Sequence, residues 1–236
     1  MRLHTTTVLS LTALAVLVLS GCSTGSADST DPTSPATVSV HSDGESAPAS
    51  AQLSSAALAK RLLDESDLGE GYTRTPQRPA QHDDVTVIGC PALEKLGSEV
   101  AVGGSLDFPH KAKVSFSYAG GSGSEVEEEL YSDAEDKLSR GVGRIFEAMT
   151  SCPAYQVLAG STPVTVTTQK VAVAHLGDEQ WSQLLTFTAG GRSSVVKQTA
   201  VRTGTVVVVV SGSPGLVDAH VHQAVTKATA VRSTER

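Results

Sequence analysis

The chain has 236 residues, a formal net charge of −7 and 39% hydrophobic residues, so it is long enough to bury a core. Its acidic balance, with no run of Lys and Arg, argues against nucleic acid and against peripheral binding to anionic lipid. Aromatic residues make up only 4% of the chain, which leaves few platforms for stacking bases or sugars. We therefore do not expect nucleic acid as a partner.

The N-terminal segment predicts export and lipid anchoring. A short basic start precedes an apolar run, residues 8–19, which suits a signal peptide and is too short to span a membrane. The run closes with Leu19-Ser20-Gly21-Cys22, which resembles the lipobox of bacterial lipoproteins. This resemblance implies that residues 1–21 are a lipoprotein signal peptide and that Cys22 is lipidated, with acyl chains such as palmitate. The alternative is ordinary secretion, with a cysteine near the cleavage site by chance.

Residues 22–52 are expected to form a tether. After Cys22 the segment contains no aromatic residue and no Leu, Ile, Lys or Arg, so it cannot bury enough apolar surface to fold. As a flexible coil it would have a root-mean-square reach of about 30 Å. We expect the remaining residues, 53–236, to be a single domain held at the extracytoplasmic face of the cell membrane.

The chain contains three cysteines, and the lipid would occupy Cys22. In an oxidising envelope the other two, Cys90 and Cys152, are expected to form a structural disulfide. In the chain-entropy model such a bond contributes about 4 kcal/mol to the free energy of unfolding. The functional alternative is a reactive thiol or a metal site, but neither cysteine has the C-x-x-C or Cys/His spacing that would support it.

The first half of the domain predicts short helices and one hairpin. Leu58, Leu62 and Leu63 share one face of an expected helix over 56–65, capped by Ser55. The elements expected next are a β-rich run at 85–88, a short helix at 91–96, a half-buried strand at 112–118 and its partner at 125–131.

Glutamates alternate along the second strand of this hairpin, at Glu125, Glu127 and Glu129, opposite Val126 and Leu130. We expect these glutamates to form a solvated outer face. The alternative is a cation site, but calcium sites usually draw their oxygen ligands from a loop.

The clearest helix is expected over 133–151, where apolar residues recur at helical spacing and Ser132-Asp133-Ala134-Glu135 fits a capping box. Gly141 and Gly143 each weaken such a helix by up to about 1 kcal/mol relative to Ala. Close approach of another backbone is the expected reason for both glycines.

The second half predicts a β meander with strands at 164–173, 180–189, 193–202 and 205–211, and a closing helix that begins at Ser213-Pro214. Residues 206–210 are five consecutive valines, so the last strand is apolar on both sides. Such a strand is covered on both faces, or covered on one and lining an apolar cavity on the other. The predicted fold class is α+β, an antiparallel β-sheet with helices packed against it.

Four features together resemble one known family: Cys90, the amphipathic helix that ends before Cys152-Pro153, Leu176-Gly177-Asp178-Glu179 with Trp181 nearby, and the VRTGTVVV run at 201–208. They are similar to the PknH-like extracellular sensor domain, found on actinobacterial receptor Ser/Thr kinases and in free-standing lipoproteins. The resemblance implies an antiparallel sheet with packed helices and a cleft proposed to bind an unknown ligand. Unlike the kinase versions, this sequence has no kinase domain, no transmembrane helix and one candidate disulfide instead of two.

No constellation of residues in the sequence predicts catalysis. His220 and His222 are the only close histidine pair, and two positions apart on a helix they point in different directions, so a solvated face explains at least one. Asp178 and Glu179 are adjacent carboxylates in an expected turn, where side chains also diverge. Walker A, G-x-S-x-G and H-E-x-x-H elements are missing. We expect no enzyme, no cofactor and no metal site.

Two classes of function remain. The first is a sensor-like domain that binds a small or lipidic ligand in a cleft, with Trp181, Asp178 and Glu179 as candidate ligand-binding residues. Core packing is the alternative for Trp181. The second class is a non-enzymatic adaptor lipoprotein that binds another cell-envelope protein. A deep concavity favours the first class, and an exposed apolar patch favours the second.

Overall fold

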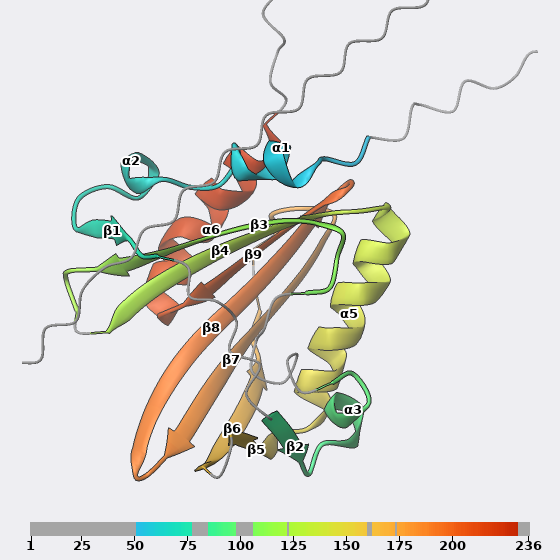
Figure 1. The fold of residues 1–236 in the computed structure, drawn as a ribbon, viewed down its shortest axis with the longest axis vertical. Coiled ribbons are helices and arrows are strands. Elements are labelled where there is room, and N and C mark those ends of the chain that lie inside the picture. Colours follow the sequence, from blue (N-terminus) through green and yellow to red (C-terminus); the bar gives the residue numbers. More distant parts are fainter. Residues whose placement is uncertain are drawn as a thin grey trace, which may run out of the picture. The chain divides into compact units, whose positions relative to one another are not determined.

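The computed structural model describes residues 51–76, 85–97, 106–121, 123–159, 162–172 and 174–230 (Figure 1). The expected signal peptide, Cys22 and nearly all of the expected tether lie outside these residues. None of the helices in the described ranges has both the length and the apolar character needed to cross a membrane.

The described strands form a nine-stranded antiparallel sheet in the order β1-β3-β4-β9-β8-β7-β6-β5-β2. Their bounds are β1 Tyr72–Arg74, β2 Val85–Ile88, β3 His110–Tyr118, β4 Ser124–Ser132, β5 Ala154–Ala159, β6 Thr162–Lys170, β7 Glu179–Ala189, β8 Arg192–Thr203 and β9 Val206–Gly212. The α+β class and the C-terminal meander are confirmed, since β5 to β9 are neighbours in both sequence and sheet. Strands β1 and β5 are not among the predicted elements. Strand β1 has only three residues, whereas Tyr155 and Val157 of β5 are buried in alternation.

Helices flank the sheet, with bounds α1 Ser55–Ala59, α2 Glu65–Leu68, α3 Pro91–Glu94, α5 Glu135–Ser151 and α6 Pro214–Thr229 (Figure 1). The expected single helix over 56–65, capped by Ser55, is wrong. Ser54 caps α1 by accepting a hydrogen bond from the backbone N–H of Ala57. Asp64 then accepts hydrogen bonds from the backbone of the next turn, so a second helix, α2, begins there.

The expected capping box of α5 is also wrong. The helix begins at Glu135, and its N-cap residue, Ala134, offers no side-chain hydrogen bond. Ser132 is buried instead at the end of β4, where its hydroxyl donates to the carbonyl of Thr205 (2.8 Å) and accepts from the N–H of Leu53 (2.8 Å). The hydroxyl therefore joins β4 to the residue that precedes β9.

Strand β9 is covered on both faces. Val206, Val208 and Val210 pack in a core with α1 and α6, whereas Val207 and Val209 pack in a second core with α5. All five valines are buried. Burying a valine side chain contributes about 1.5 kcal/mol or more to the free energy of unfolding, so this strand strongly stabilises the layers around it.

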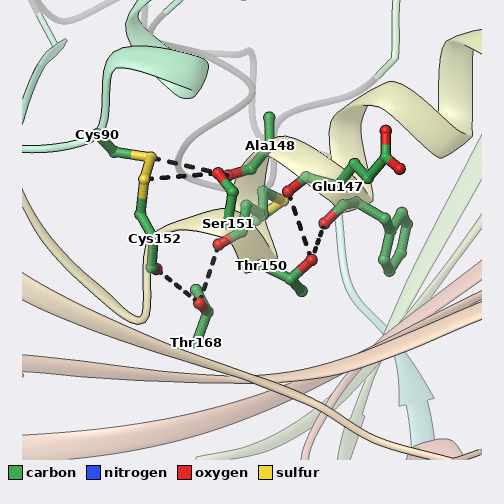
Figure 2. Close-up of a disulfide and its surroundings, with 9 residues drawn as sticks. Cys90, Glu147, Ala148, Thr150, Ser151, Cys152 and Thr168 are labelled. Atoms are coloured by element: carbon green, nitrogen blue, oxygen red, sulfur yellow. Dashed lines mark hydrogen bonds between the residues drawn. A yellow bond between two sulfur atoms is a disulfide. The ribbon is translucent and has the colours of Figure 1, made fainter.

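A disulfide joins Cys90 to Cys152, as the cysteine count predicts, with the Cα atoms 5.7 Å apart. The bond links the N-cap of α3 to the residue that ends α5. Figure 2 shows a second restraint on the same turn: the hydroxyl of Thr168 in β6 donates to the carbonyls of Met149 and Cys152, both at 2.9 Å. The C-terminal end of α5 is therefore held by the disulfide and by the sheet.

The glutamates of β4 fit the expected solvated face only in part, since Glu125 is exposed and Glu127 is half-buried. Glu129 is only 6% exposed. The Nζ atom of Lys113 in β3 lies 2.6 Å from Glu127 and 3.0 Å from Glu129, and the hydroxyl of Tyr131 donates to Glu129. Burial of Glu129 is tolerated because its carboxylate pairs with Lys113 and accepts a hydrogen bond from Tyr131. In the described ranges no group of three or more His, Cys, Asp or Glu side chains is placed to hold a metal ion.

Glu128 lies on the opposite face of β4, in the core with α1 and α6. Its side chain is 1% exposed and sits between the buried Val126 and Leu130. Oε2 accepts a hydrogen bond from the N–H of Leu63 (2.6 Å), and Oε1 has no hydrogen-bond partner among the described residues. Burial raises the pKa of the Glu128 carboxyl to about 8, so the group is mainly neutral at pH 7.

We expect Glu128→Gln to remove part of the pH dependence of stability. The carboxyl ionises near pH 4.5 in the unfolded chain and near pH 8 in the folded domain. Between these values the unfolded state has already lost the proton, so wild-type stability falls as pH rises. From about pH 5 to about pH 8 the wild type should lose roughly 3 kcal/mol more than the variant, measured by urea unfolding. Parallel pH profiles would contradict a buried neutral carboxyl.

Candidate functional site

A cavity of about 330 Å³ lies between α5 and the strands β6 and β7. We term it the α5–β7 groove. Its lining combines aromatic, hydroxyl, cationic and acidic side chains with one glycine: Phe146, Trp181, Ser139, Thr150, Ser182, Arg140, Arg144, Lys170, Glu147 and Gly143. Most of these residues belong to α5, so the helix that covers the sheet also supplies one wall of the groove.

Trp181 of β7 both packs on the core and lines the groove. Its ring lies against Phe146 of α5, with the ring centroids 6.3 Å apart, and it borders the core beneath α5. The indole also lies below Gly143, because a Cβ atom built there would be 3.8 Å from the indole Cζ2 and Nε1 atoms. Both interpretations of Trp181, core packing and cleft lining, therefore apply to parts of the same side chain.

The two glycines of α5 have different surroundings, and neither faces the backbone that we expected. A Cβ atom at Gly141 would lie 2.7 Å from the ring of Phe108, which is too close for a packed contact. A Cβ atom at Gly143 would make ordinary contact with Trp181. A side chain at Gly141 would therefore force the Phe108 ring to move, whereas Gly143 leaves space in the groove.

Three cations and one carboxylate lie along the groove. Arg140 pairs with Asp136 of the same helix (2.5 Å), but these side chains are 68% and 61% exposed, so the pair contributes little. Arg144 and Lys170 are exposed and have no ion-pair partner among the described residues. With Glu147 counted, the lining carries a charge of +2 (three cations less one carboxylate) in a chain of net charge −7.

The structure places Asp178 and Glu179 around Arg202. The Arg202 Nε atom donates to Glu179 (2.9 Å) and an Nη atom donates to Asp178 (3.3 Å). Asp178 also accepts from the N–H of Gly204 (2.7 Å), and the Arg202 hydrogen bond lowers the pKa of Glu179. Neither carboxylate is among the described residues that line the groove. Glu179 nevertheless touches the lining, because the hydroxyl of Ser139 donates to it (3.0 Å).

Sequence reasoning missed the charged residues of the groove. Arg140, Arg144 and Glu147 recur at helical spacing on α5, but a charged stripe on a helix more often marks a solvated face. Lys170 carries no local signal, because only its register with Gln183 of β7 brings it to this site.

The two close histidines diverge as their spacing predicts. His222 is exposed, whereas His220 is buried on the inner face of α6. A ring nitrogen of His220 lies 2.6 Å from the hydroxyl of Tyr72, and burial lowers the pKa of His220. This contact joins α6 to the edge strand β1.

Comparison with solved structures gives the fold a known counterpart. The extracellular domain of PknH from Mycobacterium tuberculosis matches with a TM-score of 0.53 and 13% identity, over 75% of this chain and 95% of that one. An uncharacterized protein from Mycobacterium smegmatis, an Rv0999 ortholog, matches with a TM-score of 0.40 and 12% identity, over 73% and 97% of the two chains. No family model and no curated protein matches the chain. The chain therefore has a PknH extracellular-domain fold, and the comparisons indicate no enzyme family.

The two glycine positions should respond oppositely to alanine. Gly143→Ala is expected to stabilise the domain by about 0.5 to 1 kcal/mol, because Ala favours the helix and the methyl group fits against Trp181. Gly141→Ala is expected to destabilise it by about 1 to 3 kcal/mol, because the methyl group meets the Phe108 ring. Urea unfolding of both variants beside the wild type measures the difference. Equal changes in the free energy of unfolding would contradict the different surroundings of the two glycines.

Proposed function

We propose that the chain is a lipid-anchored extracytoplasmic binding protein whose domain takes a small ligand in the α5–β7 groove. The observation that carries this proposal is a concavity that contains the only tryptophan of the chain, space at Gly143, and two cations without ion-pair partners among the described residues, Arg144 and Lys170. Ligand sites combine apolar surface with a few polar groups in this way. The domain acts by binding, without a catalytic step or a cofactor.

The size of the groove favours a small molecule over a lipid carrier. Pockets for drug-sized ligands span roughly 300 to 1,000 Å³, and this cavity of about 330 Å³ lies at the lower end. A carrier of acylated molecules needs a much larger cavity.

Three features support the membrane-anchored, extracytoplasmic location. The lipobox-like sequence at Cys22 follows a signal-peptide-like run. The disulfide between Cys90 and Cys152 suits an oxidising compartment. The fold is shared with an extracellular domain. A sensor-like role agrees with the family that the sequence resembles.

A second candidate function is an adaptor that binds another cell-envelope protein, and one surface favours it. The face of β2 and β5 to β8 that points away from α5 carries Thr165, Thr167, Thr188, Val195 and Ile88, all exposed. We term it the threonine face. In the described strands its one charged side chain is Lys197, which pairs with Asp218 of α6. A partly apolar face with a single, paired charge on an acidic protein suits a protein partner.

Lipid anchoring is tested by growing cells with an alkyne analogue of palmitate and probing the purified chain for the label. The wild type is expected to carry it and Cys22→Ala is not, because Cys22 offers the thiol that the lipid modifies. An immunoblot controls for protein amount. A label that persists in Cys22→Ala would contradict the anchor.

Ligand binding is tested on a secreted form: the mature chain with Cys22→Ser, exported behind an ordinary secretory signal peptide. Native mass spectrometry is expected to show an added mass that denaturation releases. The mass of the protein itself is expected to fit one disulfide. Gly143→Ala should reduce the ligand-bound fraction at least about tenfold, since its methyl group occupies space beside Trp181. If the wild type shows only the mass of the protein itself at every protein concentration, the result would argue against a tightly held ligand and favour the adaptor.

A further inference from the structure

The free polar groups of the α5–β7 groove are mostly hydrogen-bond donors. Arg144 and Lys170 can only donate, and neither has an ion-pair partner among the described residues. The indole N–H of Trp181 is a further donor without a hydrogen-bond partner in the described ranges. Glu147 is the single carboxylate among the described residues of the lining. The groove therefore suits a ligand rich in acceptor atoms.

The cations stand on two different walls. Arg140 and Arg144 occupy successive turns of α5, whereas Lys170 ends β6 beside Gln183 of β7. An oxyanion between these walls can accept hydrogen bonds from both, and the planar guanidinium group suits carboxylate and phosphate oxygens. The exposed pair of Arg140 with Asp136 is weak, so Arg140 can also turn toward such an anion.

Apolar surface lies between the two walls. Trp181 contributes its indole, and Phe146 packs against that ring. Because Gly143 lacks a side chain, the edge of the indole at Cζ2 and Nε1 stays uncovered there, where a methyl group would make contact at 3.8 Å, and a flat group can reach the indole past this edge. Flat apolar groups stack well on an indole.

We infer that the ligand of the α5–β7 groove is a small organic anion, a carboxylate or phosphate group joined to a flat apolar body. This inference rests on the proposed function and adds the chemical class of the ligand. The anionic group lies between Arg144 and Lys170, and the flat body lies along Trp181 at Gly143. Glu147 opposes the same anion, so removing its charge strengthens binding.

The test uses the secreted form, whose single tryptophan, Trp181, reports on the groove by fluorescence. Phenyl phosphate is the probe, benzyl alcohol is the uncharged comparison, and inorganic phosphate is the anion alone. We expect phenyl phosphate to bind more tightly than either of the others. Its affinity should fall as salt concentration rises, since the charges of the groove are exposed.

Charge variants give the sharpest evidence, because the expected effects have opposite signs. Arg144→Gln and Lys170→Gln should each weaken phenyl phosphate binding about tenfold, and Glu147→Gln should strengthen it about twofold to threefold. Lys137→Gln removes the same charge from an exposed position of α5 outside the groove lining, so it should leave the affinity unchanged. Gly143→Ala should weaken binding about tenfold while the domain stays folded, which separates lost binding from lost structure.

Specific results would overturn the inference. Equal affinity for benzyl alcohol and phenyl phosphate, or shifts of the same sign in Arg144→Gln and Glu147→Gln, would exclude an anion. If, in that case, benzyl alcohol still changes Trp181 fluorescence in the wild type and not in Gly143→Ala, the result would show that the groove binds a ligand, and the proposed function would stand. No change in Trp181 fluorescence with any of the three probes would count against both the proposed function and the inferred class of ligand.

Vesicles distinguish a soluble anion from a lipid headgroup. The secreted form is sedimented with phosphatidylglycerol vesicles and, separately, with phosphatidylcholine vesicles. We expect no cosedimentation with either, because the cavity is small. Cosedimentation with phosphatidylglycerol alone, abolished by phenyl phosphate, would assign the anion to a lipid and overturn the small soluble ligand.

Discussion

The burial of β9 on both faces is the constraint on which the rest of the structure depends. Successive valines of one strand point to opposite sides of a sheet, so each side needs its own cover. Helices α1 and α6 cover one side, and α5 covers the other. One short apolar run thus accounts for a three-layer arrangement, in which helices lie on both faces of a single sheet.

The groove is a consequence of that arrangement, because covering β9 uses only one face of α5. Leu138, Val142 and Met149 point into the cores, and the polar face that remains supplies the wall of the groove. The disulfide and the Thr168 hydrogen bonds hold the C-terminal end of the helix. The wall therefore cannot shift far without exposing apolar side chains, which makes the groove a pre-formed feature of the fold.

Much of the fold could be predicted from sequence, since alternation and helical spacing record which side chains are buried. The three-residue strand β1 is too short to show such a pattern. The site was harder to predict. Trp181 is conspicuous as a single tryptophan, but Lys170 comes near it only through strand register. Arg202 pairs with Asp178 and Glu179, the two carboxylates predicted to bind a ligand. Glu128 was predictable in principle, because it lies between two apolar residues at a spacing of two and must therefore face inward.

The strand order also bears on how the domain folds. β9 pairs with β8 on one side and with β4 on the other, where Val126 lies opposite Gly212. Of the described elements, β9 and α6 come last in the chain. Until β9 pairs, the two parts of the sheet, β1-β3-β4 and β8-β7-β6-β5-β2, have no strand between them. Pairing partners so distant in sequence must close a long loop before contacts form, which slows folding. The domain therefore closes both cores only once β9 has paired with β4 and β8.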